Sequence, residues 1–150
     1  MAMEVVQWIV AAATALFVAT VGFFQWRTAQ QKAVLDLFDR RYEIYSVVRK
    51  AVGQVVTQSQ GFDQKREIEF LAAKERAYFF FGDDLVSYLE RLWIAIVDVT
   101  SADAEMGGAS GADLKKIIER RRKAFNQVED FYKTGQPLFG RYMRFEQTAP

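Results

Sequence analysis

Carboxylates are the side chains of this sequence with the greatest capacity for catalysis. Asp36, Asp39 and Glu43 lie near one another on one predicted helix. The chain contains no cysteine and no histidine, which excludes thiolate nucleophiles, imidazole bases and the commonest transition-metal ligands. A carboxylate di-metal site in a helical bundle usually needs histidine as well, so we expect these acids to pair with neighbouring arginines. The composition predicts no enzyme activity, no metal site and no cofactor.

A run of basic residues is the second candidate site. It consists of Lys115, Lys116, Arg120, Arg121, Arg122 and Lys123. Only Asp113 and Glu119 oppose these charges, so the run can attract anionic lipid or nucleic acid. A helix spreads the six side chains over much of its circumference, however, and Glu119 can pair with Lys123. We favour an ordinary solvated face, keep an anionic ligand surface as the alternative, and do not expect nucleic acid as a partner.

The element that precedes these residues is a long apolar segment, Val5–Phe24. About 20 residues form about 30 Å of helix, which is enough to cross the hydrocarbon core of a bilayer. Trp8 and Trp26 lie near its two ends, where aromatic residues mark membrane interfaces. Arg27 begins a series of basic residues, and none precedes the segment, so the C-terminal side is expected in the cytoplasm.

Two other interpretations of this segment compete with a membrane span. A cleaved signal peptide would need basic residues before the apolar run and a cleavage site after it, and the sequence offers neither. A buried helix of a soluble oligomer would have to be surrounded by protein, for which the rest of the chain is too small. We therefore expect an uncleaved anchor with the lipid bilayer as its partner.

Small residues recur along one side of the anchor. Ala11, Ala15 and Ala19 are four residues apart, and Gly22 follows three residues later. Such spacing lets membrane helices approach closely, although alanine is also common in membrane helices without this contact. We expect a helix–helix contact here and a homo-oligomer or a larger membrane complex.

The remaining sequence predicts an all-α fold. No proline precedes Pro137, and the apolar runs have the length and period of helices. The membrane helix can therefore continue without a break to about Thr57. We expect a transmembrane anchor over residues 1–26 and a cytoplasmic antiparallel helical bundle over residues 27–150.

The cytoplasmic part of the first helix carries an apolar seam that a partner helix should cover. The seam comprises Val34, Phe38, Tyr45, Val48, Val52 and Val55. Arg41 occupies one place in it, and an ion pair with Asp39 is one hypothesis for how the register is fixed.

Three further helices complete the predicted bundle, after a turn at Gln58–Phe62. The second helix starts after an N-cap at Asp63 and ends at Gly82; Asp83 and Asp84 cap the third. The predicted buried positions of the third helix are Leu85, Leu89, Leu92, Trp93, Ile96 and Val99. Those of the fourth helix, residues 112–133, are Leu114, Ile117, Ile118, Phe125, Val128 and Tyr132.

Two segments outside these helices remain. Ser101–Gly111 is expected to be a loop, because it is rich in glycine and small residues. The tail from Pro137 onward is expected to dock as a short helix through Phe139, Tyr142 and Phe145. The aromatic residues 78–81 and Trp93 are expected in the core, with a ligand pocket as the alternative.

Two motifs give the sequence a resemblance. Leu35–Tyr45, reading LDLFDRRYEIY, follows the apolar segment, and Phe79–Leu85, reading FFFGDDL, precedes Tyr88–Glu90. Together they resemble a widespread set of uncharacterised small bacterial single-pass membrane proteins with a helical cytosolic domain. The resemblance implies an inner-membrane location and no known activity.

These observations lead to two expectations of function. The first is a membrane-anchored interaction or scaffold protein, either self-associating or an accessory subunit of a larger membrane complex. The alternative is a membrane-tethered sensor or effector that binds an anionic ligand, lipid or nucleic acid through the basic fourth helix.

Overall fold

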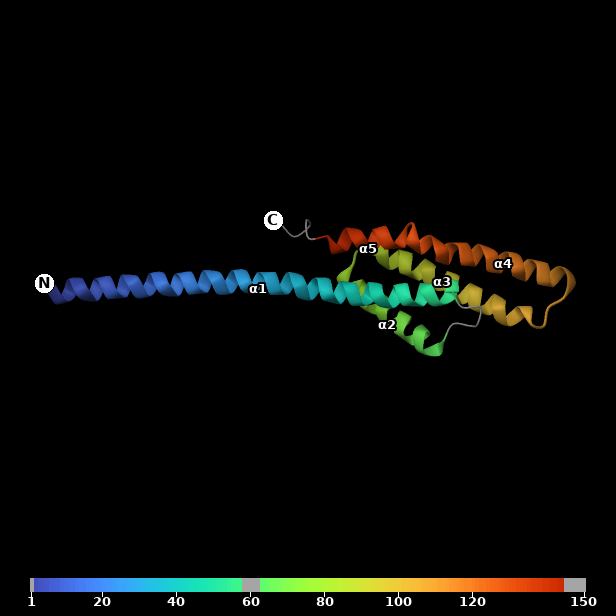
Figure 1. Cartoon of the computed structure of the whole chain (residues 1–150), viewed down its shortest axis with the longest axis horizontal. Coiled ribbons are helices and arrows are strands. Elements are labelled where there is room, and N and C mark those ends of the chain that lie inside the picture. Colours follow the sequence, from blue (N-terminus) through green and yellow to red (C-terminus); the bar gives the residue numbers. More distant parts are fainter. Residues whose placement is uncertain (1, 58–62, 145–150) are drawn as a thin grey trace. The chain divides into compact units, whose positions relative to one another are not determined.

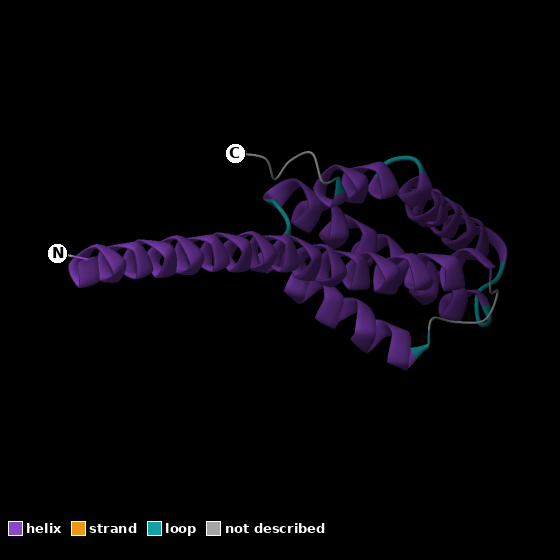
Figure 2. Cartoon of the chain, turned by 60° about the vertical axis from the view of Figure 1, so that its left-hand side comes forward, coloured by secondary structure: helices purple, strands orange, loops and turns teal. Residues whose placement is uncertain are grey.

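The computed structural model describes residues 2–57 and 63–144, and the regular structure in them is helical throughout (Figures 1 and 2). This confirms the all-α prediction. The elements are α1 (Ala2–Thr57), α2 (Gln64–Phe80), α3 (Asp83–Met106), α4 (Gly111–Glu129), the 3-10 helix η1 (Asp130–Tyr132) and α5 (Gly135–Met143). The predicted turn at Gln58–Phe62 lies outside the described residues.

The chain divides into two compact units, Met1–Leu37 and Phe38–Pro150. The first unit consists of the N-terminal part of α1, which is helical without a break as predicted. The predicted domain boundary after residue 26 concerns a membrane surface, and it stays a prediction.

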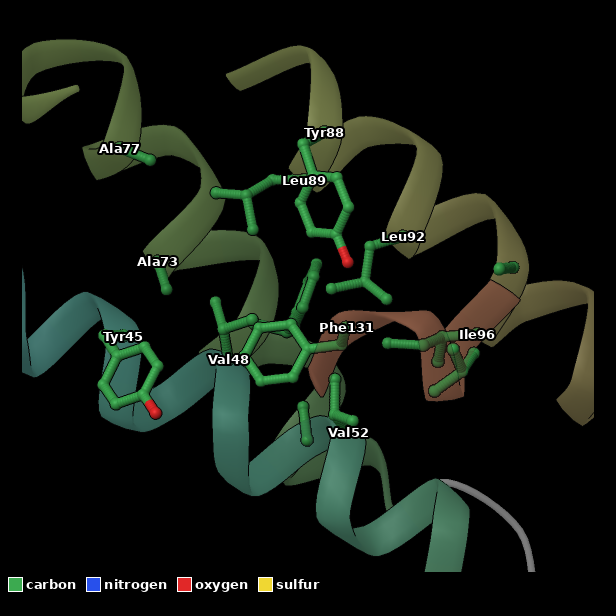
Figure 3. Packing of buried hydrophobic residues seen from close by; sticks show 14 of the residues in the cluster. Tyr45, Val48, Val52, Ala73, Ala77, Tyr88, Leu89, Leu92, Ile96 and Phe131 are labelled. Carbon is green, nitrogen blue, oxygen red and sulfur yellow. The ribbon is translucent and has the colours of Figure 1, made fainter. Parts of the chain in front are cut away.

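The second unit, Phe38–Pro150, is a helical domain with one apolar core. The C-terminal part of α1 contributes Val48 and Val52, and α3 contributes Leu89 and Ile96, all completely buried. Figure 3 shows these side chains gathered around Phe131 of η1. Helices α3 and α4 lie side by side along much of their length (Figure 1). Most of the predicted seam of α1 and the predicted stripe of α3 are therefore core.

Helix α2 packs through one aromatic and two small residues. Its buried face consists of Phe70, Ala73 and Ala77, and Phe70 stacks on Trp93 of α3 with ring centroids 5.4 Å apart. Asp63 is the N-cap as predicted, because its side chain accepts a hydrogen bond from the backbone N–H of Lys65. The predicted start of this helix is therefore confirmed.

The start of α3 differs from the prediction. Its N-cap is Gly82, in an extended conformation, and Asp83 and Asp84 occupy the first helical turn. Their negative charges still face the positive end of the helix dipole, so the electrostatic argument applies one residue further into the helix. The cap itself was assigned to the wrong residues.

The end of α3 corrects the predicted loop at Ser101–Gly111. The helix continues to Met106, and Ala102 is completely buried against the rest of the domain. Ala102 and Ala104 are also strong helix formers, so local propensity and burial both extend the helix, and only residues 107–110 lie outside helices. Gly111 begins α4 with a positive φ of 62°.

The C-terminal part of α4 also corrects the predicted stripe. Val128 is buried as expected, but Tyr132 and Ile118 are 44% and 48% exposed, while Phe131 is completely buried. For Phe131 and Tyr132 the cause is η1, which tightens the chain to about three residues per turn and brings the position three after Val128 onto the buried face. Ile118 lies within α4, where its neighbour Ile117 is the half-buried one. The predicted single helix over 112–133 is therefore an α-helix followed by a 3-10 turn.

The tail forms α5, which confirms the predicted short helix. Phe139 is completely buried and meets Tyr45 and Phe81 edge to face, each with ring centroids 5.3 Å apart. Gly135 begins this helix in a tight space, because a Cβ there would lie 2.6 Å from the hydroxyl of Tyr88. Phe145, also predicted to dock, lies outside the described residues.

Candidate functional site

The N-terminal part of α1 presents apolar side chains that no described residue covers. In the described residues one helix is long and apolar enough to cross a membrane, and its most apolar window has no buried residue. Trp8 and Trp26, predicted at the membrane interfaces, are 77% and 58% exposed, and Arg27 is exposed. Lipid or another protein is needed to cover such a surface.

The threonines of this part of α1 have hydrogen-bond partners within the helix. Thr14, Thr20 and Thr28 each donate a hydroxyl hydrogen bond to the backbone carbonyl four residues earlier, at 2.7 to 2.9 Å. A hydroxyl satisfied in this way needs no water. The threonines are therefore compatible with an apolar environment around the helix.

The predicted contact residues Ala11, Ala15, Ala19 and Gly22 are all exposed on α1. A Cβ added at Gly22 would meet no atom within 4 Å. The small-residue side is thus unoccupied within the described chain and open to another helix, so the predicted contact stays a prediction.

The structure divides the basic run of α4 into paired and unpaired charges. Arg120 pairs with Glu105 of α3 at 2.8 Å, and Arg122 contacts Glu119 of its own helix at 3.8 Å. Arg121 forms an ion pair with Asp103 of α3, in which the side chains are only 29% and 23% exposed. Half of the predicted anionic-ligand surface is therefore neutralised by protein carboxylates.

Arg121 has a structural role that the sequence did not reveal. It lies between Ile117 and Ala124 on the half-buried side of α4, and its guanidinium lies 5.8 Å from the ring centroid of Phe125. It joins α4 to the end of α3 that was expected to be a loop. By contrast, Lys115, Lys116 and Lys123 form no ion pair within the described residues.

Arg41 connects the ends of two helices. Its Nε donates to the carbonyl of Phe80 at 2.9 Å, and its Nη1 donates to the carbonyl of Tyr142 at 2.6 Å. These residues lie in the last turns of α2 and α5, where backbone carbonyls lack intrahelical partners. The hypothesis that Arg41 pairs with Asp39 was therefore wrong, since the guanidinium binds two helix C-termini instead.

Aromatic rings enclose the same guanidinium. The Cζ atom of Arg41 lies 5.7 Å from the ring centroids of both Phe81 and Tyr142. Burial lowers the pKa of Arg41 from its ordinary value of 12.5. An arginine side chain in a protein nevertheless stays charged at neutral pH. The charge is stabilised by two carbonyl dipoles and two aromatic faces.

Asp84 holds α5 from the other side. Its Oδ1 accepts a hydrogen bond from the hydroxyl of Tyr142, and its Oδ2 lies 3.0 Å from Nη2 of Arg141. The hydrogen bond from Tyr142 lowers the pKa of Asp84, and the same bond raises the pKa of Tyr142. Arg41 lies in the segment LDLFDRRYEIY and Asp84 in the segment FFFGDDL, and both contact Tyr142 of α5.

The aromatic cluster does not form one pocket. Phe81 is buried and Trp93 half-buried, as expected of core residues, but Tyr78 and Phe79 are 68% and 79% exposed.

Within residues 2–57 and 63–144, no group of three or more histidine, cysteine, aspartate or glutamate side chains is arranged to hold a metal ion. Comparison with protein-family models, curated proteins and solved structures found no match.

Proposed function

We propose that this protein is a membrane-anchored interaction or scaffold protein. In this proposal α1 crosses the bacterial inner membrane once and carries a cytoplasmic antiparallel helical bundle. The protein self-associates or serves as an accessory subunit of a larger membrane complex. The observation that carries the proposal is the uncovered apolar part of α1.

The energetic argument starts from the cost of leaving that surface in water. The complete transfer of each large apolar side chain out of water is favourable by about 1.5 to 3 kcal/mol of free energy. Leu16, Phe17 and Val18 are 62% to 70% exposed, and they point to different sides of one turn. A single protein groove covers one side of a helix, whereas lipid covers every side, so the all-round distribution favours a bilayer.

Topology is tested with the full-length chain. A reporter fused after Pro150 should be active in the cytoplasm and silent in the periplasm, and alkaline carbonate should leave the protein in the membrane fraction. Activity in the periplasm would reverse the orientation, and release by carbonate would exclude the anchor.

Self-association is proposed through the small-residue side of the anchor. Replacing Ala15 and Ala19 by isoleucine would obstruct close approach while raising hydrophobicity, so insertion should persist and the cross-linked oligomer should diminish. Ala13→Ile is the matched control, because Ala13 lies on the opposite side of the helix. An unchanged cross-linking ladder in the double variant, or a monomeric parent, would exclude this contact.

The alternative of an anionic-ligand sensor acting through the basic helix has weaker support. Arg120, Arg121 and Arg122 have carboxylate partners, and displacing those partners would cost part of the binding free energy. Lys115 and Lys116 remain available for anionic lipid. Binding to vesicles with anionic lipid that is lost in the Lys115→Gln, Lys116→Gln variant would favour this alternative over a scaffold.

A further inference from the structure

A groove of about 620 Å³ lies between α3 and α4, within the helical domain. Its polar lining comes from Arg91 of α3, from Lys123, Asn126 and Gln127 of α4, and from Asp130 of η1. Tyr88 and Leu92, which are 8% and 3% exposed, also line it. The volume falls in the range of sites that bind small molecules, about 300 to 1,000 Å³.

The basic residues in this groove differ from the three arginines of the basic run on α4. Neither Arg91 nor Lys123 forms an ion pair or a side-chain hydrogen bond in the part of the chain that the structure describes. Arg120 and Arg121, on the same helix, both have carboxylate partners on α3. Two cations from two helices therefore line one groove without a close carboxylate partner among the described residues.

We propose that this groove binds a small organic anion that carries a phosphate or carboxylate group and hydroxyl or amine donors. Arg91 and Lys123 would take the anionic group, since a guanidinium can bind two of its oxygens at once. The carboxamides of Asn126 and Gln127 can both donate and accept hydrogen bonds to the polar substituents. Leu92 and Ile94 provide an apolar wall for the carbon skeleton.

Asp130 restricts the class of ligand. Its carboxylate is the one acidic group among the residues that line the groove, and it lies close enough to Tyr88 to contribute, after burial, to raising the pKa of that hydroxyl to about 12. A polyphosphate or a second carboxylate placed here would be repelled, whereas a hydroxyl or amine could donate to it. The groove therefore fits a single phosphate or carboxylate group on a hydroxylated or amino-bearing skeleton better than a polyphosphate or a dicarboxylate.

This inference goes beyond the proposed scaffold function, because the groove lies within the helical domain and needs neither lipid nor a second copy. The experiment uses the full-length protein in mild detergent and measures its thermal unfolding. The probes are a sugar monophosphate, a nucleoside monophosphate, an amino acid and inorganic phosphate, each compared with sodium chloride of equal ionic strength. At least one organic probe should raise the unfolding temperature more than chloride does.

Single variants then locate the binding site. Arg91→Gln and Lys123→Gln should each weaken the affinity of the active probe about tenfold or more, because each removes a charge-assisted hydrogen bond. Lys116→Gln and Arg122→Gln are matched controls, since both residues are exposed on α4 and neither lines the groove. These controls should keep the parent affinity.

Three results would overturn the inference. The first is a panel in which no organic probe stabilises the protein beyond chloride. The second is stabilisation that persists in the Arg91→Gln, Lys123→Gln double variant. The third is an equal loss of affinity in Lys116→Gln. Because Arg91 and Lys123 are exposed, their variants should unfold at the parent temperature without ligand, which separates a loss of binding from a loss of folding.

Discussion

The two parts of α1 are equally helical, yet their apolar side chains have different surroundings. From Val6 to Ala33 every side chain is exposed. Further along, the buried residues of the same helix are Ile44, Tyr45, Val48, Ala51, Val52 and Val55. The difference lies in how apolar residues are distributed around the helix rather than in their number.

In the second part the apolar residues follow one stripe, and Arg49 and Lys50 lie exposed between its members. A stripe can be covered by the chain's own helices, which is what α2, α3 and α5 do. In the first part, apolar residues surround the helix, so no small domain can cover them. The comparison predicts that a change of valine to aspartate will destabilise the helical domain when it is made in the second part. The same change in the first part should weaken membrane insertion instead.

The largest expected effect comes from placing the same charge in each part. Val52→Asp would put a carboxylate at a completely buried position and should destabilise the helical domain by about 4 kcal/mol or more, which abolishes cooperative unfolding. Val18→Asp should leave the unfolding of the domain in detergent unchanged, because Val18 is 62% exposed. Circular dichroism during heating measures both.

The membrane-bound fraction should respond to the two variants in the opposite order. Val18→Asp is expected to raise the free energy of membrane insertion by about 2.5 to 3.5 kcal/mol, so the membrane-bound fraction should fall. Val52→Asp should leave that fraction unaltered. If Val18→Asp lowered the unfolding temperature as Val52→Asp does, the apolar part of α1 would be packed within the protein and the comparison would fail.

The sequence predicted those features that depend on the period of apolar residues. The continuity of α1, the cap at Asp63 and most buried positions of α3 all follow from local patterns. The loop at Ser101–Gly111 was wrong because burial of Ala102 and the pairing of Asp103 with Arg121 are long-range effects. The pattern of neighbouring residues does not predict such contacts.

The roles of the charged residues were predicted least well, for the same physical reason. Arg41 was recognised as a polar residue in an apolar seam, but its acceptors lie 39 and 101 residues away in sequence. Arg121 was grouped with five other basic residues because sequence distance does not distinguish a side chain that faces α3 from one that faces water. The groove needs two helices: the sequence predicted Lys123 as part of an anionic-ligand surface, but nothing in it placed Arg91 of α3 beside that residue.

A smaller effect sharpens the comparison within the covered part of α1, at adjacent arginines. Arg41→Gln should destabilise the helical domain by about 2 kcal/mol, because two helix-terminal carbonyls lose a charged donor. Arg40→Gln should change stability by less than about 0.5 kcal/mol, since Arg40 is exposed. Urea unfolding of both variants gives the two values, and equal values would remove the helix-capping role of Arg41.

The basic run of α4 offers the next comparison. Arg121→Gln should cost about 1 kcal/mol, because it breaks a partly exposed ion pair and a contact with Phe125. Arg122→Gln should be nearly neutral, since that side chain is 76% exposed and its contact with Glu119 is 3.8 Å long. The same unfolding assay distinguishes them. Losses of similar size would mean that the run acts as one surface and that the structural distinction drawn for Arg121 is wrong.

The smallest effect concerns the hydrogen bond from Tyr142 to Asp84, which joins α5 to α3. Its stabilisation needs an ionised Asp84, whose pKa is lowered from 3.8, and should disappear as the pH falls through and below that value. It also needs a protonated Tyr142, whose pKa is raised from 10.0, and should disappear as the pH rises above that value. Between these limits the contribution should be constant.

Tyr142→Phe removes both limbs of this pH dependence. The difference in urea midpoint between the parent and Tyr142→Phe should therefore be largest near about pH 7 and shrink towards about pH 3 and pH 11. Tyr132→Phe is the matched control, because Tyr132 is 44% exposed and its hydroxyl makes no hydrogen bond to any described residue. Asp84 and Arg141 are themselves 46% and 61% exposed, so solvent screens the pair and the effect stays small. A difference that did not vary with pH would mean that Tyr142 stabilises α5 through its ring alone, by packing against Phe81 and Arg41, and that Asp84 is dispensable for holding this helix.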